Sequence, residues 1–395
     1  RMSHASPEAE APGGSTPPKS YARGRVDLRA IGLAVAAPVL ALLVAIVVTS
    51  LVLLATGDPV GEVWRQMLTQ PSASQTVIII NSATVLYFSA IAVAIGFRMN
   101  LFNIGVDGQY RVAAFAAAAV GGEAWLPGPL NIVLILITAM MCGALWAGIA
   151  GWLKVTRGVS EVISTIMLNA IATGVVAWLL ARVAAEQEAG SNDIGTKDLP
   201  ESSRIPGLSL VPGTGRQVYG LIFLAILVGF LYWFVINRTR FGFDLRATGR
   251  SESAAVASGV DVKKMVLVSM LMSGAVAGLV GLPLLLGENF NYGTDFQSGL
   301  GFSGIAIALL GRNHPVGVAL GALLWAYLEQ QAVTLPIATD VDDSIVKIIQ
   351  GVMVLAVVIA YEVVRRFQRR MEQQQVTREL AAQDKRPAET TGAQA

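Results

Sequence analysis

The residues of this chain that could take part in chemistry are polar side chains that lie inside apolar stretches at helical spacing. In GVSEVISTIMLN (158–169), Glu161, Thr165 and Asn169 follow one another at intervals of four, with Ser164 beside them, and they share one face of a helix. Polar groups on an apolar helix turn toward a bundle interior or a cavity, which predicts a path for a polar solute. The alternative is structural, with Ser164 and Thr165 bonded to their own backbone and Asn169 to a neighbouring helix.

A second polar group opens another apolar stretch, in NIGVDGQ (103–109). Asp107 lies where a helix should start, so it could cap backbone N–H groups there, and substrate recognition by Asn103, Asp107 or Gln109 is the alternative. Three more asparagines could hydrogen-bond a polar solute, one within an apolar run and two in GENFNYG, namely Asn81, Asn289 and Asn291. Phe290 and Tyr292 flank the last two and could stack on a ring.

Catalytic and metal-binding patterns are missing from the sequence. There is no G-x-x-x-x-G-K-[ST] phosphate loop, so ATP hydrolysis by that device is excluded. No Ser-His-Asp, zinc-ligand or paired-carboxylate pattern indicates an enzyme. The single cysteine, Cys142, excludes an internal disulfide, and His314 has no second ligand near it. We expect a chain without catalysis, metal or cofactor, whose energy source is another polypeptide.

Composition sets the class of fold that positions these residues. Of 395 residues, 54% are hydrophobic and 14% charged, and the mean hydropathy is +0.59, whereas about 25% of a typical globular domain is charged. A net charge of +2 is too small to indicate nucleic acid. We predict an all-α polytopic bundle in a lipid bilayer. Runs near the length that a spanning helix needs lie at 30–55, 76–95, 104–120, 128–153, 160–182, 218–236, 265–287, 296–310, 315–330 and 344–364.

The distribution of charge predicts the orientation. Cytoplasmic loops collect Lys and Arg, and the stretch 238–264 alone carries six. The loops 288–295 and 331–343, on the other predicted side, have acidic residues and no basic ones. With about ten spans, both chain ends are then cytoplasmic.

Three parts follow from these patterns. Residues 1–28 are rich in proline, glycine and serine, which predicts a disordered cytoplasmic tail. Residues 29–364 form the transmembrane domain, with 237–264 as its large cytoplasmic loop, and 365–395 form a basic, polar cytoplasmic tail.

Two short, glycine-interrupted segments lie at similar places in the two halves. NIGVDGQ (103–109) opens one and LGFSGIA (300–306) lies in the other, and each precedes a run of small residues. Such pairs indicate internal repeats and broken helices at a transport path. Close helix packing through glycine is the alternative explanation.

The cytoplasmic loop holds a short predicted helix. Ser251 can cap it, the alanines of SAAVASG (253–259) favour it, and Gly259 can end it in a left-handed conformation. A short helix with small side chains fits a groove on a partner.

Four stretches carry a family resemblance: GFRMNLFNIGVDGQ (96–109), GVSEVISTIMLN (158–169), SAAVASG (253–259) and GFSGIAIALLGRNHPVG (301–317). Together they resemble the permease subunits of bacterial ABC importers, in the branched-chain amino acid, simple-sugar and nucleoside family, and the nucleoside subgroup above all. The resemblance covers about 97–364.

This resemblance implies a multi-pass permease of the bacterial cell membrane that moves nucleosides or related purine-type solutes inward by alternating access. It also implies three partners, namely a cytoplasmic ABC ATPase, an extracytoplasmic substrate-binding protein and a second, related permease. SAAVASG matches the E-A-A-x-x-x-G signature that couples importers to their ATPase, with Ser253 in place of glutamate. The residues that we expect to carry the coupling are Arg246, Arg250, Glu252, Ser253, Ala254, Ala255 and Gly259.

Other functions remain open at this point. A simple-sugar permease is the nearest alternative, although GIAIALLGRNHP (304–315) is less like the glycine-pair signature expected of sugar permeases. An ion-coupled transporter would need charges in mid-span, and Arg111 is the main one. A membrane-embedded enzyme lacks a reactive constellation.

Overall fold

Nearly all the regular structure of this protein is helical. The computed structural model describes residues 28–183, 194–339 and 341–384. The helices are α1 (Leu28–Thr56), α2 (Val60–Met67), α3 (Ala73–Arg98), α4 (Val106–Gly122), α5 (Gly128–Arg157), α6 (Glu161–Val183), α7 (Ile222–Arg238), α8 (Arg240–Arg250), α9 (Glu252–Ala257), α10 (Val262–Gly278), α11 (Leu282–Leu284), α12 (Leu300–Leu310), α13 (Pro315–Ala338) and α14 (Ser344–Asp384). A 3₁₀ turn (η1, Glu201–Ser203) and a π-helical turn (η2, Leu285–Asn289) complete them.

Local sequence explains where several helices begin and end. Ser72 and Gln75 form a capping box before α3, in which each side chain accepts a hydrogen bond from the other residue's backbone N–H. Proline near the first position starts α5 and α13. Gly158 ends α5 in a left-handed conformation at φ 67°.

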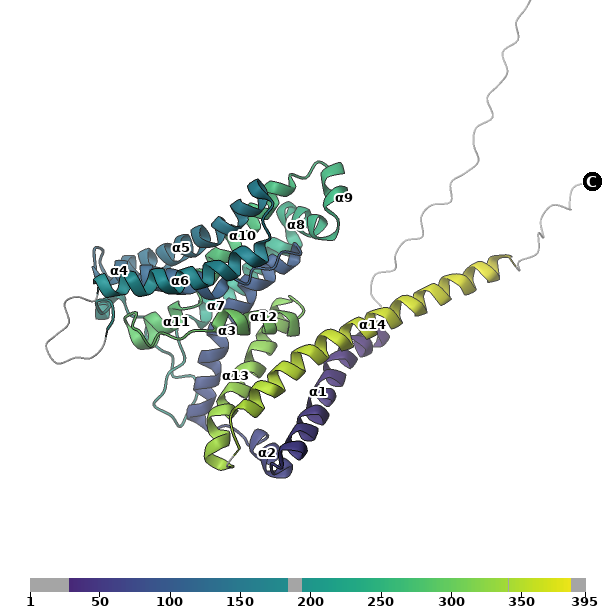
Figure 1. Ribbon diagram of the computed structural model, residues 1–395, viewed down its shortest axis with the longest axis horizontal. Coiled ribbons are helices and arrows are strands. Elements are labelled where there is room, and N and C mark those ends of the chain that lie inside the picture. The colour runs from purple at the N-terminus through teal and green to yellow at the C-terminus, as the bar shows by residue number, and fades with distance from the viewer. Residues whose placement is uncertain (1–27, 184–193, 340, 385–395) are drawn as a thin grey trace, which may run out of the picture.

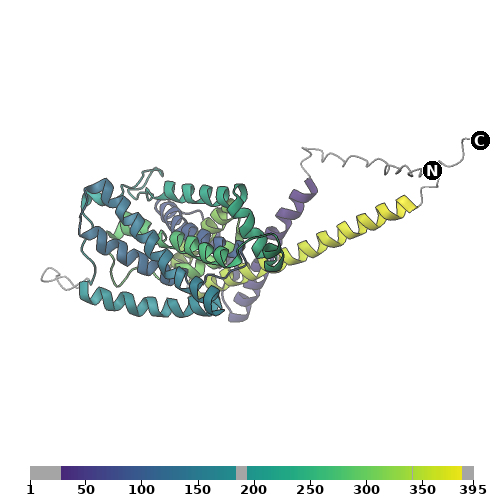
Figure 2. The ribbon, with the colours of Figure 1, turned by 90° about the horizontal axis from the view of Figure 1, so that it is seen from above.

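The bundle is organised around α3. This helix packs against α7, α10, α12 and α13, and its most apolar stretch is 72% buried. The helices α4, α5 and α6 cover one side, while α1 and α14 pack on each other and form an arm on the far side (Figures 1 and 2).

A glycine seam joins α5 to α10. Gly274 and Gly278, one turn apart on α10, face the backbone of Gly143 and Ala139 on α5, and a Cβ on either glycine would collide with that backbone. Small residues four apart let two helices approach closely where no hydrophobic effect drives them together. The contact between α5 and α10 is accordingly the most extensive one between helices.

Five of the described helical segments are long and apolar enough to cross a membrane, namely Ala73–Arg98, Gly128–Arg157, Glu161–Val183, Val262–Asn289 and Ser344–Val364. Helices α7 and α8 add a sixth if they are taken as one span bent by 72°. Large apolar side chains such as Leu145, Met167 and Phe223 are exposed on the outside of these helices, as expected of a protein in lipid.

Each of the ten predicted segments overlaps a helix, but they are not alike. Helices α4 and α12 have only 17 and 11 residues, so they are short for a bilayer. Helix α14 continues beyond 364 to Asp384 into the predicted C-terminal tail. The predicted N-terminal tail lies outside the described residues, apart from Leu28.

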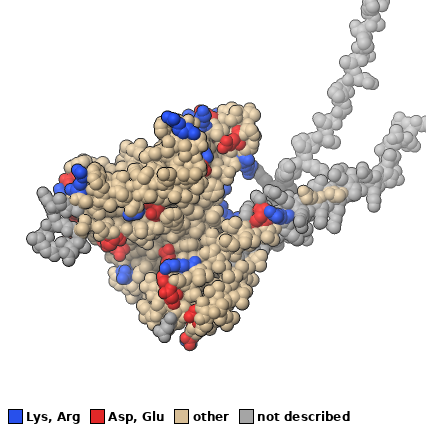
Figure 3. Space-filling model, in the orientation of Figure 1, with Lys and Arg blue, Asp and Glu red and all other residues tan. Residues whose placement is uncertain are grey.

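The loops gather at two ends of the bundle. One end, here called the α9 end, holds α8, α9 and the turn at 311–314, and Arg98 donates from Nη2 to the carbonyl of Asn313 there at 2.7 Å. At the opposite end, Asn81 donates to the carbonyl of Gln217 and Asn131 to the hydroxyl of Ser203. The loops predicted to be cytoplasmic therefore share one end, and Lys and Arg side chains gather around α8 and α9 (Figure 3).

Candidate functional site

The polar residues before α4 form a buried hydrogen-bonded cluster. The side-chain amides of Asn103 and Gln109 pair with each other, at 3.0 and 2.8 Å, and both are about 1% exposed. Asn103 Nδ2 also donates to the hydroxyl of Ser273 on α10 at 2.8 Å, and Ser273 donates to the carbonyl of Ala92 on α3. The cluster thus ties three helices together, and each polar group in it has a partner, as burial requires.

Asp107 joins the starts of the two short helices. Its Oδ1 accepts hydrogen bonds from the backbone N–H of Gly299 at 2.8 Å and of Gly301 at 3.4 Å, at the N-terminus of α12. A carboxylate here satisfies N–H groups that the helix leaves unpaired and lies at its positive end. Asp107 therefore bonds helix N–H groups, which was the structural alternative stated for it, but these groups belong to α12 and not to α4, and substrate recognition by Asp107 stays a prediction.

The polar face of α6 packs on the same segment. Asn169 accepts a hydrogen bond from the N–H of Gly108 and donates to the carbonyl of Ile104, both at 2.9 Å. Ser164 and Thr165 donate to backbone carbonyls of their own helix. These contacts are the structural alternative stated for this face, and substrate contact by its residues stays a prediction.

Glu161 lies at the α9 end of α6. Its Oε2 pairs with Nζ of Lys154 at 2.6 Å, and its Oε1 accepts from the N–H of Phe102 at 3.4 Å. The residue is 7% exposed, so the carboxylate depends on these partners. It fastens the end of α5 to the loop before α4.

The remaining predicted path residues lie toward the opposite end. Asn81 bonds the backbone of Gln217 and Tyr219, and Asn291 donates to Asp198 Oδ1 at 2.9 Å. Asn289 closes the π-helical turn. The structure thus unites Asn103, Asp107, Gln109, Thr165 and Asn169 around the entry to α4. Ser164 bonds only the carbonyl of Ser160, and Asn81, Asn289 and Asn291 lie apart from the group.

The predicted coupling helix is α9. The Ser251 hydroxyl accepts from the N–H of Ala254 at 3.3 Å and Gly259 follows at φ 80°, as the sequence predicted for its two ends. The hydroxyl of Ser253 lies 3.1 Å from that of Ser251, at the start of the helix. Ala254 faces out, whereas Ala255 is 2% exposed and packs inward.

Charged and apolar groups share the surface around α9. Arg250 and Glu252 are exposed, while Nη1 of Arg246 is buried without a hydrogen-bond partner. Phe243 and Val256 are each more than 60% exposed, although they are large and apolar. Neither residue was predicted from the sequence, in which the signal for each was an apolar residue within an otherwise polar loop.

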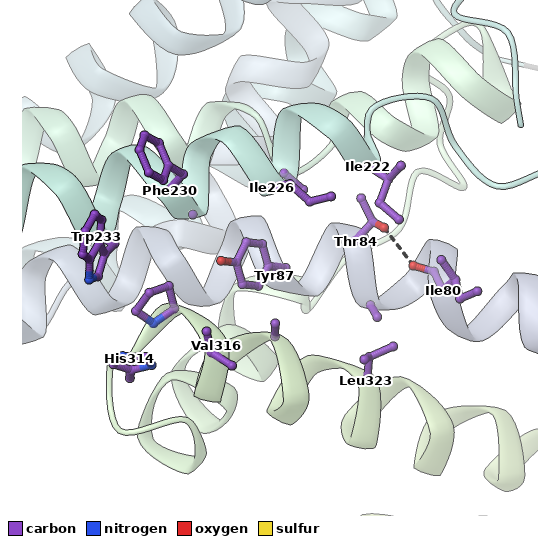
Figure 4. Close-up of a pocket in the computed structure, with 15 residues that line it drawn as sticks. Ile80, Thr84, Tyr87, Ile222, Ile226, Phe230, Trp233, His314, Val316 and Leu323 are labelled. Carbon is purple, nitrogen blue, oxygen red and sulfur yellow. Dashed lines mark hydrogen bonds between the residues drawn. The ribbon is translucent and has the colours of Figure 1, made fainter. Parts of the chain in front are cut away.

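An apolar groove of about 580 Å³ opens between α3, α7 and α13 (Figure 4). Its walls carry Ile226, Phe230 and Leu323, and the hydroxyl of Thr84 is bonded to the carbonyl of Ile80 in its own helix. Tyr87, Trp233 and His314 also line it, but most of its surface is apolar, so it suits an apolar occupant better than a polar solute.

A smaller cavity of about 310 Å³ lies between α4, α6 and the loop before α12. Arg111 and Thr173 line it together with Tyr292, Thr294 and Phe296. This cavity combines a cation, hydroxyl groups and aromatic rings. Arg111 stands out in the sequence as the main mid-span charge, but the sequence does not connect it to these distant residues.

Comparison with known proteins gives a consistent result. A family model described as "Branched-chain amino acid transport system / permease component" matches residues 75–358. The guanosine ABC transporter permease protein NupP of Bacillus subtilis is 38% identical over 286 residues, which are 72% of this chain and 81% of that protein. A glucose ABC transporter permease protein of Haloferax volcanii is 31% identical over 82% of this chain and 87% of its own. The nucleoside ABC transporter permease protein NupB of Lactococcus lactis is 29% identical over 70% and 77%.

Proposed function

The chain belongs to the family of permease components of branched-chain amino acid transport systems, and from this membership we propose that it carries nucleosides across the bacterial plasma membrane as the permease of an ABC importer. As a permease component, it is a membrane transport subunit and not itself an enzyme. An ATPase and a substrate-binding protein are its partners in general. The finer proposal concerns the cargo, the topology and the coupling.

Nucleosides are the favoured cargo because two of the relatives described above are nucleoside or guanosine permeases, and the guanosine permease reaches 38% identity. A specific observation also keeps simple sugars as a second candidate. The glucose permease of Haloferax volcanii matches a larger share of this chain, 82%.

The proposed topology has ten spans with both chain ends in the cytoplasm. The gathering of basic side chains at the α9 end supports this orientation, since cytoplasmic loops collect Lys and Arg. The short helices α4 and α12 are counted as spans because each one connects loops that lie at opposite ends of the bundle. A loop that reaches into the bundle before α12, held there by Asp107, accounts for the shortness of α12.

The single observation that carries the proposal is the form of α9. It is a six-residue helix that is capped at Ser251 and followed by left-handed Gly259. It is exposed at the α9 end of the bundle, where the basic residues gather. We propose that α9, with Arg246, Arg250 and Glu252, fits a cleft of the cytoplasmic ATPase and transmits its motion to α8 and α10, which contact α9. Exposed Phe243 and Val256 add an apolar contact.

A second, related permease would complete the path. The polar residues around the entry to α4 would line it on this chain's side, through movements that free Asn103, Gln109 or Asn169 from their present partners. Alternating access requires such rearrangement.

Uptake by the complete transporter tests the proposal. The full chain is expressed with its ATPase, binding protein and partner permease in a host that lacks other nucleoside uptake, and labelled guanosine and glucose are compared. We expect guanosine uptake that stops when the ATPase is inactivated. Glucose uptake without guanosine uptake would replace the nucleoside proposal by the sugar one, and uptake that persists without the ATPase would contradict the ABC mechanism.

A further inference from the structure

Arg111 is a cation within a largely buried helix, and Asp107 lies one turn before it. Its Nη1 donates to Oγ1 of Thr173 on α6 at 2.9 Å, while its Nε is buried without a hydrogen-bond partner. Among the residues that the structure describes, no acidic side chain forms an ion pair with it. Charges inside a membrane protein are costly unless paired, and they mark functional sites. Thr173 and Tyr292 use only part of the five N–H donors of the guanidinium, so it can still donate to an acceptor from outside the chain.

The cavity beside Arg111 is built for a small, flat molecule. Its volume of about 310 Å³ is at the lower end of the range for small-molecule sites. Tyr292 and Phe296 stack at 4.5 Å between ring centroids and form a rigid aromatic wall. Burial raises the pKa of the Tyr292 phenol, and a hydrogen bond with Arg111 lowers it in part, so this hydroxyl stays neutral near pH 7. Apolar groups of α6, such as Val176 and Leu180, form the other side.

The chemistry of the guanidinium narrows the class of ligand. Arginine has five N–H donors and no acceptor, so it needs a ligand with acceptors at one edge. Among nucleosides, the 6-oxopurines present O6 and N7 side by side, a pair that arginine recognises with two parallel hydrogen bonds. Adenosine places an amino donor where O6 would be, and a guanidinium cannot pair with it.

We propose that the Arg111 cavity is a subsite for the base of 6-oxopurine nucleosides, in which the guanidinium donates to O6 and N7 while Thr173 holds it in place. This inference rests on the proposed function, because it takes nucleosides as the cargo. Arg111 then acts as a specificity-determining residue of the permease. The apolar groove of Figure 4 has donors in Tyr87, Trp233 and His314, but it has no guanidinium.

The test compares the uptake of labelled guanosine and adenosine by the complete transporter. The variants are Arg111→Met, Arg111→Lys and Thr173→Val, with Arg182→Met as the matched control. Arg182 is an exposed cation that lies over Trp178, and it does not line the cavity. Because the binding protein is the same in every case, a change in the ratio of the two uptake rates reports on the permease.

We expect Arg111→Met to lower the guanosine-to-adenosine ratio about tenfold, which corresponds to the loss of a charge-assisted hydrogen bond. Arg111→Lys keeps the charge but loses the planar fork, so it should lower the ratio by a smaller factor. The ratio for Thr173→Val should lie between the ratios for Arg111→Lys and the wild type. Arg182→Met should have the wild-type ratio.

The possible outcomes separate the two proposals. Equal loss of both nucleosides in Arg111→Met, or an unchanged ratio, overturns the inference and leaves the proposed function standing. If Arg111→Met does not reach the membrane, a wild-type ratio in Arg111→Lys and Thr173→Val overturns it instead. A wild-type transporter that takes up neither nucleoside overturns the proposed function and this inference together.

Discussion

The carboxylate of Asp107 accepts a hydrogen bond from the backbone N–H of Gly299 at 2.8 Å, which links the starts of α4 and α12 across 192 residues of sequence. Asp107 lies in the first turn of α4 and is 7% exposed. Gly301, two residues on, touches the Asp107 backbone so closely that a side chain would not fit. The two short helices therefore share one buried junction.

Removing this junction should destabilise the protein. In Asp107→Ala, the N–H groups of Gly299 and Gly301 lose their acceptor, which costs about 1–3 kcal/mol. Asp107→Asn keeps an acceptor oxygen and should lose less. Thermal unfolding of the purified permease in detergent measures both, and an alanine variant as stable as the wild type would show that the junction contributes nothing.

The ion pair of Lys154 and Glu161 should show coupling in a double-mutant cycle. Lys154→Met leaves a nearly buried carboxylate without its cation and should be destabilising. The double variant Lys154→Met with Glu161→Gln removes both charges and should recover part of the loss. Unfolding of the four proteins should give a coupling free energy of about 0.5–3 kcal/mol. Additive effects of the two substitutions would contradict a direct interaction.

The glycine seam should tolerate no large side chain. Gly278→Leu would place atoms against the carbonyl of Ala139 and push α10 away from α5, with a cost of about 1–3 kcal/mol or more. Gly351→Leu is the matched control, because a Cβ at Gly351 meets no atom within 4 Å. Size-exclusion chromatography of fluorescently tagged variants should show less folded Gly278→Leu than control. Equal amounts of folded protein would mean that α5 and α10 can separate at this glycine without loss of stability.

Coupling through α9 should fail when its outer face is changed. Ala254→Glu puts a bulky acid on the exposed side of α9, so we expect loss of uptake and of ATPase co-purification with normal amounts of permease in the membrane. The same change at exposed Ala338, at the other end of the bundle, serves as control. If Ala254→Glu transports normally, α9 is not the site of coupling.

Local signals predicted the helices and their ends well. Ser251 and Gly259 delimit α9 as expected, because capping and left-handed glycine depend on neighbouring residues alone. The polarity of Asn103, Asp107 and Asn169 within apolar segments likewise singled them out, and hydrogen bonding within the protein was the structural alternative stated for Asp107 and Asn169. These residues act through chemistry that is visible in one segment.

Partners across the bundle could not be predicted in the same way. Asp107 could have capped its own helix, and its pairing with Gly299 depends on how α12 is placed against α4. The seam of Gly143 with Gly274 and Gly278 depends on the rotation of two helices, which an apolar sequence leaves undefined. The link from Arg111 to Thr173 and Tyr292 required three distant segments to be brought together.

The burial of α3 among its neighbours restricts how this helix can move. Apart from the part that lines the apolar groove, its neighbours cover it, and 72% of its most apolar stretch is buried, against 28% for α5 and for α6. Rotation or translation of α3 would break its packing contacts with several helices at once. If a passage opens and closes, we therefore expect α3 to stay in place. The helices that move would be the less buried ones, such as α5 and α6.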